Sequence, residues 1–276
     1  VIKNDWDTVA SIADVTKALK VNPKIDAIAI QISESAGGLR HPVEEIAKAA
    51  KEINPDIMVI ADGITAVGVE RIDVSCIDCL IAGSQKALML PPGLSMLGLS
   101  SKAIEKIGEG KGYYLNLASE IKKQSQNTTA YTAATTLIIG LRSVLQKIEE
   151  NGGLGKLYCD TARRAKATRF ALEAIGLHSY PSVPARSMTT IDDENAAEIR
   201  EILKTDFGVN VAGGQDHLKG KIFRINQMGF IEPYELAWVV NAVELSLARI
   251  GRREFDGTAS RVFNEEYFKS ILGKIK

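Results

Sequence analysis

IMVIAD at residues 57–62 and CLIAGSQK at residues 79–86 are the two stretches that decide the fold of this chain. Both are too short for an ordinary helix and are rich in Ile, Val and Leu, so each is predicted to be a buried strand of a parallel sheet. Parallel strands end at the same rim of a sheet, which is where open α/β sheets bind ligands. We therefore expect Asp62 and Lys86, which close the two stretches, to face one small molecule.

A lysine and an aspartate at one rim suit the chemistry of pyridoxal phosphate. The lysine amine can form a Schiff base with the cofactor aldehyde, and the carboxylate can keep the pyridine nitrogen protonated, so that the ring withdraws electrons. The two residues alone leave a simpler interpretation open, in which Asp62 caps a following helix and Lys86 is a solvated loop residue. The surrounding sequence distinguishes these two interpretations.

Four segments distinguish the two interpretations: ESAGG at residues 34–38, DGI at 62–64, GSQKALMLPPG at 83–93 and GKIFRI at 220–225. In this order they closely resemble the class V aminotransferases, specifically the alanine–glyoxylate and serine–pyruvate aminotransferase group. The match around Lys86 is the most specific, and the resemblance runs through most of the chain. It favours the cofactor interpretation over the simpler one.

The resemblance implies a role for each matching residue at the cofactor. Lys86 would form the Schiff base and later carry the proton between substrate and cofactor. Asp62 would pair with the pyridine nitrogen, and Ile64 would pack on the ring. Ser35 and Gln85 would contact the substituents of the ring.

Arg224 matches the arginine that clamps the substrate carboxylate in this family. A planar guanidinium suits that task, since it gives a carboxylate two parallel charge-assisted hydrogen bonds. The alternative is an ordinary cross-strand charge pair. Ile222, Phe223 and Ile225 make the run too apolar for a freely solvated strand, so we expect a buried arginine that needs an anion.

Thr129 and Thr132 fall where the resemblance sends a hydroxyl from one subunit to the cofactor phosphate of the other. Threonines before a helix are also N-cap signals, and a helix is predicted over residues 133–150. Both interpretations can hold, and Thr132 is the preferred phosphate contact.

The rest of the chain predicts strands alternating with helices up to residue 108, and so a parallel sheet covered on both faces. After Gly152 and Gly153 the pattern changes. We expect a large cofactor-binding domain over residues 1–150 and a small α+β domain over 151–276, with the last helix running through residues 252–276. With the resemblance, this predicts a mostly parallel three-layer α/β domain of the pyridoxal phosphate fold type I.

The family's glycine-rich phosphate cradle and its ring-stacking aromatic residue precede the region that begins at Val1. No GxGxxG or GxxxxGK sequence replaces that cradle. We therefore expect the N-terminal part of the family domain to be absent from this sequence. The sequence is then either a fragment of a longer polypeptide or a chain that could hold the cofactor only weakly.

Composition excludes several classes of protein. The 34 basic and 34 acidic residues balance, so nucleic acid is not an expected partner. No apolar run is long enough to cross a membrane, and the start lacks a signal-peptide pattern. We expect a cytoplasmic protein, with an organelle left open if residues precede Val1. Cys76, Cys79 and Cys159 are expected to be free thiols, and the scattered histidines predict no metal site.

The expected function is a pyridoxal phosphate-dependent transamination. The resemblance suggests alanine or serine as amino donor, glyoxylate or pyruvate as the 2-oxo acid acceptor, and a homodimer with shared active sites. Two alternatives stay open. One is a cysteine desulfurase-like enzyme, which needs a mobile cysteine near the pocket; the other is a catalytically silent dimer subunit or fragment of the same fold.

Overall fold

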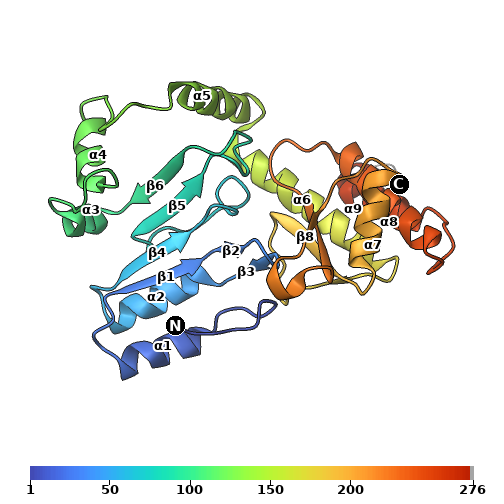
Figure 1. Cartoon of the computed structure of the whole chain (residues 1–276), viewed down its shortest axis with the longest axis horizontal. Helices are drawn as coiled ribbons and strands as arrows, with labels where there is room; N and C mark the ends of the chain where they lie inside the picture. The colour runs from blue at the N-terminus through green and yellow to red at the C-terminus, as the bar shows by residue number, and fades with distance from the viewer. Residues whose placement is uncertain (274–276) are drawn as a thin grey trace.

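A four-stranded sheet forms the first half of the computed structural model, which describes residues 1–273 (Figure 1). The strand order is β1 (Ala27–Gln31), β4 (Met58–Asp62), β5 (Cys79–Gly83) and β6 (Ser95–Leu99). β1, β4 and β5 are parallel, as the sequence predicts, whereas β6 returns antiparallel to β5. Because Asp62 pairs with Ile81, the carboxyl ends of β4 and β5 lie at one rim.

Helices α1 (Ile12–Val21) and α2 (Val43–Ile53) cover one face of this sheet. Their apolar residues pack with inward-facing side chains of the strands, among them Ile28 and Val59. On the opposite face Gln31 is exposed and Asp62 is half-buried. The expectation of a sheet covered on both faces is therefore met on one face only within the described residues, and the open face carries Asp62.

The buried carboxylate of Asp78, which directly precedes β5, links the start of that strand to α2, to β4 and to the end of β6. It accepts hydrogen bonds from Lys51 Nζ of α2 (2.5 Å), from the Val59 backbone N–H of β4 (2.9 Å) and from Ser100 Oγ after β6 (3.1 Å). Burial alone would raise the pKa of Asp78, but the donors outweigh it and hold the pKa below its ordinary value. Asp78 directly precedes β5, so this contact fixes the start of the strand that leads to Lys86.

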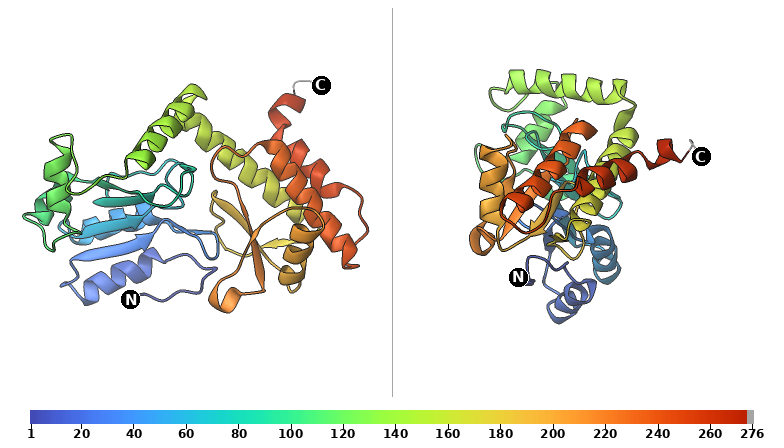
Figure 2. Two further views of the ribbon diagram at one scale, coloured as in Figure 1. Left: turned by 45° about the horizontal axis from the view of Figure 1, so that its top comes forward. Right: turned by 90° about the vertical axis from the view of Figure 1, so that its right-hand side faces the viewer.

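Two long helices, α5 (Thr135–Glu150) and α6 (Gly153–Glu173), connect the first half to the second (Figures 1 and 2). They meet at Gly152 and Gly153, which both have positive φ, so the chain turns sharply there. The predicted domain boundary falls at this turn. The division into residues 1–150 and 151–276 remains a prediction.

The second half is an antiparallel sheet backed by helices. Its main apolar core lies between the sheet and the helices, with Phe223, Leu203, Val243 and Phe263 fully buried. The strand order is β7 (His178–Ser179), β8 (Met188–Asp192), β10 (Ile222–Asn226) and β9 (Ala212–Gly213), and the helices are α7 (Ala196–Thr205), α8 (Pro233–Arg249), α9 (Thr258–Tyr267) and α10 (Lys269–Leu272).

The prediction of a single C-terminal helix over residues 252–276 is wrong. The chain divides at Phe268 into α9 and α10, and Ile271 and Leu272 are exposed instead of packed. Residues 274–276 lie outside the described residues. Short elements that the sequence analysis did not identify are α1, β2 (Ser33–Glu34), β3 (Leu39–Arg40), α4 (Leu117–Gln124), β7 and the 3-10 turn η1 (Asp216–Leu218), while α3 (Ser101–Ile107) falls where a short helix was expected.

We predict that Asp78→Ala lowers the free energy of unfolding by about 3 kcal/mol, because it leaves the buried Val59 N–H without its acceptor and the half-buried Lys51 ammonium without its carboxylate. Urea unfolding at neutral pH measures this. Since the pKa of Asp78 is lowered in the folded state, its contribution is complete above the ordinary carboxyl pKa and is lost as the pH falls through the folded value.

The matched control is Asp56→Ala. Asp56 pairs with Lys102 at 3.4 Å, but its side chain is 94% exposed, so its loss should cost less than about 0.5 kcal/mol. Equal effects of the two substitutions would contradict the role of Asp78.

Candidate active site

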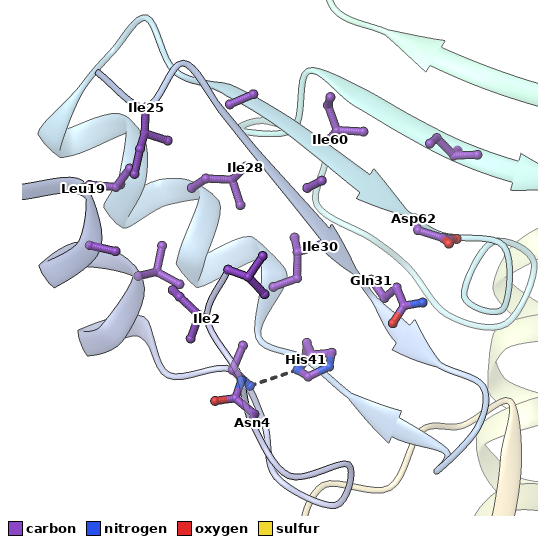
Figure 3. Close-up of a pocket in the computed structure, with 17 residues that line it drawn as sticks. Ile2, Asn4, Leu19, Ile25, Ile28, Ile30, Gln31, His41, Ile60 and Asp62 are labelled. Atoms are coloured by element: carbon purple, nitrogen blue, oxygen red, sulfur yellow. Dashed lines mark hydrogen bonds between the residues drawn. The ribbon is translucent and has the colours of Figure 1, made fainter. Parts of the chain in front are cut away.

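Asp62 lies at the carboxyl end of β4, in the wall of a cavity of about 660 Å³ (Figure 3). Ile60 and Ile81 contribute to its apolar lining on the open face, and Gln31 lies beside Asp62 at the end of β1. The lining also includes Ile28, which faces the helices, so the cavity extends round the edge strand β1. Asp62 Oδ1 accepts the backbone N–H of residue 64 at 2.9 Å, which closes the turn after the strand. Among residues 1–273 no lysine or arginine forms a salt bridge with it, so the carboxylate can still accept a cationic group.

Lys86 is half-buried in the turn that follows β5. Ser84, which is fully buried, holds this turn: its hydroxyl donates to Pro91 O (2.7 Å) and accepts from Leu94 N (3.2 Å). The Lys86 carbonyl accepts the Met89 N–H at 2.9 Å. No hydrogen bond or salt bridge within the described part of the chain occupies the Lys86 amine, which suits a group that has to react.

Ser35 lies in the turn between β2 and β3, and Glu34 shapes that turn. The Glu34 carboxylate accepts the backbone N–H groups of Ala36 and Gly37, each at 2.7 Å. The next residue, Gly38, has φ +75°, and a Cβ there would lie 2.4 Å from Thr190 Oγ1 of β8, so only glycine fits. The turn is thus held tightly against the second sheet.

Arg224 lies in the middle of β10 and reaches this same turn. Its Nε and Nη2 donate to Gly213 O at 2.9 and 2.6 Å, and its Nη1 donates to Ser35 O. Burial lowers the pKa of the Arg224 guanidinium, and Arg200 nearby lowers it further, whereas Glu34 raises it. The half-buried arginine is therefore bound by carbonyl groups, and within residues 1–273 it forms no salt bridge of the kind that the charge-pair alternative would require.

Two donors of Arg224 stay available. Each terminal nitrogen of a guanidinium carries two N–H groups, and the hydrogen bonds to Gly213 and Ser35 use one on each. The remaining pair can bind a carboxylate.

The other predicted residues occupy different places. Ile64 is half-buried two residues after Asp62, while Gln85 is exposed and folds back over Gly83. Thr129 and Thr132 lie in the segment between α4 and α5, which is far from β2 and β3 in the same chain (Figure 1). Thr129 Oγ1 donates to Tyr131 O at 2.5 Å, and Thr132 is exposed.

The structure therefore brings Asp62 and the Lys86 turn to one rim and joins Ser35 to Arg224, but leaves the two threonines away from both. Lys86 does not line the cavity that contains Asp62.

His41 and Glu34 are site residues that the sequence analysis did not identify. His41 lines the cavity, and its Nδ1 accepts the Ala10 N–H at 3.0 Å (Figure 3). Burial lowers the pKa of His41, Glu34 raises it and Arg40 lowers it. The glutamate opening a glycine-rich turn was a usable signal, because a carboxylate can accept the N–H groups of such a turn.

The three cysteines are free, as expected. Cys159 is exposed on α6, whereas Cys76 and Cys79 are half-buried. Burial and then the charge of Asp78 raise the pKa of the Cys79 thiol, which opposes thiolate formation. Within residues 1–273 no group of three His, Cys, Asp or Glu side chains is placed to hold a metal, and every helix is too short or too polar to span a membrane.

Comparison with known proteins identifies the family. The sequence profile described as aminotransferase class-V matches residues 1–231, so the chain belongs to the class V aminotransferases. The structure has the fold type I of these pyridoxal phosphate-dependent enzymes, and its cofactor is pyridoxal phosphate. The predictions of family, fold class, enzyme class and cofactor are confirmed.

Individual relatives agree with this family. A Helicobacter pylori protein named an uncharacterized aminotransferase is 48% identical over 265 residues, which cover 96% of this chain and 72% of that protein. The serine–glyoxylate aminotransferase of Methylorubrum extorquens is 28% identical and is matched over 93% of this chain and 68% of its own length. The solved aspartate aminotransferase of Thermus thermophilus superposes with a TM-score of 0.81 at 29% identity, covering 90% of this chain and 70% of that one.

The residues at the rim fit pyridoxal phosphate. An aspartate without a cationic partner stands at the end of one buried strand, and a lysine amine without a partner follows the end of the next, within the described chain. The cofactor offers a protonated ring nitrogen to the first and an aldehyde to the second.

Proposed function

We propose that this enzyme transfers the amino group of a small amino acid, alanine or serine, to a small 2-oxo acid, glyoxylate or pyruvate. The observation that carries the proposal is the rim itself: two adjacent parallel strands deliver the Asp62 carboxylate and the Lys86 turn, and Arg224 reaches the neighbouring turn at Ser35. When bound, pyridoxal phosphate supplies an electron-withdrawing ring that weakens the bonds at the substrate's α-carbon.

The residues of this chain divide the remaining work. Asp62 would keep the proton on the ring nitrogen, because a nearby carboxylate favours the charged form of a base. Lys86 Nζ would hold the cofactor and then move the proton at the α-carbon. Ile64 and Gln85 would contact the cofactor from the turns that follow β4 and β5.

Arg224 would orient the substrate through its two available N–H groups. A paired, charge-assisted contact fixes both the position and the rotation of a carboxylate, which brings the α-carbon to one place. Glu34 supports this arrangement, since its turn presents Ser35 O to the guanidinium.

A small donor is supported by the name of the Methylorubrum relative, which acts on serine and glyoxylate. A cysteine desulfurase-like activity has less support, because Cys159 is exposed on a helix and burial raises the pKa of the Cys79 thiol.

Lys86→Ala tests the proposal. The full-length enzyme with added pyridoxal phosphate should show the absorbance band of the covalently bound cofactor, and the substitution should abolish that band and reduce kcat by at least about a thousandfold. Lys102→Ala is the control, because Lys102 lies at the end of the sheet away from the rim, where it donates to Pro55 O. This variant should keep the absorbance band and the wild-type kcat. A band that persists in Lys86→Ala would refute the proposal.

Arg224→Ala should raise the concentration of alanine or serine that half-saturates bleaching of this band by about ten- to a hundredfold, because the buried carboxylate loses two hydrogen bonds. Arg224→Lys should recover part of the loss, since it keeps the charge without the fork. Titration of each variant with one amino acid at a time, at fixed pH, measures the half-saturating concentration from the loss of the absorbance band. An unchanged concentration dependence would refute the clamp, and preferential bleaching by aspartate would refute the small donor.

We further propose a homodimer in which Thr132 contacts the cofactor phosphate of the partner subunit. The segment that carries Thr132 lies away from the site of its own chain (Figure 1), and it packs beside an exposed aromatic cluster. Tyr113 and Tyr114 are 86% and 66% exposed and contact Tyr131. Exposed apolar groups of this kind commonly mark an interface.

Hybrid dimers test this arrangement. A dimer that pairs a Lys86→Ala subunit with a Thr132→Ala subunit should keep one complete site, with the cofactor affinity of the wild type. A dimer that carries both substitutions in one subunit should keep none, and the lost contact should weaken cofactor binding about tenfold. The reverse pattern would place Thr132 in the site of its own chain, and a monomer by light scattering would contradict the dimer.

A further inference from the structure

Met89 holds an unfavourable backbone conformation three residues after Lys86. Its φ is +56°, in the left-handed region that residues with side chains rarely adopt. Strained residues of this kind persist only where their surroundings determine them, and they gather at functional sites. The surroundings of Met89 connect it to the second half of the molecule.

The loop after β10 packs directly on the Met89 side chain. The Phe230 N–H points at Met89 Sδ at 3.2 Å. Gly229 has φ +84°, and a Cβ there would lie 2.8 Å from Met89 Cγ and 3.0 Å from Sδ, so the loop backbone touches the methionine without a side chain between them.

Arg164 fixes this loop from helix α6. It is 4% exposed, and its Nη2 donates to Gly229 O at 2.8 Å while its Nη1 donates to Ile231 O at 3.0 Å. Burial lowers the pKa of the Arg164 guanidinium. Its hydrogen bonds to these two backbone carbonyls and to the hydroxyl of Thr161 take the place of water. The loop backbone is therefore anchored to α6 on both sides of Phe230, next to Met89.

The other flank of the Lys86 turn rests on the loop that follows Asp62. A Cβ at Gly68, whose φ is +80°, would lie 2.9 Å from the Ala87 Cβ. Between these two contacts the turn closes through the hydrogen bond from Met89 N to Lys86 O, 2.9 Å long. The turn that contains Lys86 thus packs between two loops, one through Gly68 after Asp62 and the other through Gly229 after β10.

We infer that Met89 is a positioning residue for Lys86: packed against Gly229, it transmits the placement of the second sheet's loop to the turn that carries the reactive amine. The inference rests on the proposed role of Lys86. It also explains why a methionine keeps a conformation that glycine would adopt more easily, because glycine has no side chain to pack on the loop.

Met89→Gly in the full-length holoenzyme tests this inference. Glycine relieves the strain at φ +56° but gives up the packing of the side chain, so the variant should fold with a Tm within about 5 °C of the wild type. Without the side chain the turn loosens, and kcat should fall by about tenfold or more while KM for the amino acid changes less than about twofold. The pH midpoint of the bound-cofactor absorbance should also shift, by about half a unit.

Two further variants separate positioning from a purely structural role. Met89→Leu keeps an apolar side chain against Gly229 and should restore kcat and the midpoint. Asp216→Gly removes a side chain at a φ of +45° from an exposed position in η1, and should leave both unchanged.

Wild-type kcat and midpoint in Met89→Gly would overturn the inference, and so would a loss that Met89→Leu does not restore. Neither result would affect the proposed function as long as Lys86→Ala abolishes the cofactor band. A band that survives Lys86→Ala would instead refute the proposed function itself.

Discussion

The parallel pairing of β4 with β5 is the constraint on which the rest of the site depends. Its register sets Asp62 opposite Ile81, so the carboxylate and the turn that contains Lys86 leave the sheet at the same rim. The buried Asp78 carboxylate pins the other end of this pair, through Lys51, the Val59 backbone and Ser100. A slip of one residue would turn Asp62 to the helix-covered face, because side chains alternate along a strand.

Around this pair the molecule adds contacts between its two halves. Arg224 joins the second sheet to the Ser35 turn, and Gly229 joins it to the Lys86 turn through Met89. The first contact ends on the Ser35 carbonyl and the second on the Met89 side chain, and both residues border the rim. A site assembled in this way depends on the relative position of the two sheets, which is consistent with ligand pockets forming between layers of a fold.

The strands at the centre of the site could be predicted from the sequence, because buried parallel strands are short, continuous apolar runs that end at polar residues. β4 and β5 fall where these runs predicted them. β10, which is antiparallel to its neighbours, falls on the apolar run around Arg224. The antiparallel direction of β6 could not be read in the same way, since Ser95–Leu99 has the composition of either orientation.

The contacts that complete the site lie beyond local sequence. The hydrogen bond from Arg224 to Ser35 spans 189 residues, and the close approach of Gly229 to Met89 depends on where two distant loops meet. The exposed face of β1 depends on which helices reach the sheet, and a periodic pattern in one strand does not contain that information. What the residue pattern did supply was the chemical type of each group.

A crystal structure of the enzyme with pyridoxal phosphate would show whether Lys86 and Asp62 bind the same cofactor molecule. We expect a covalent bond from Lys86 Nζ to the cofactor, with the Asp62 carboxylate about 2.7–2.9 Å from the ring nitrogen of the same molecule. A cofactor bonded to another lysine, or a ring nitrogen far from Asp62, would contradict this expectation.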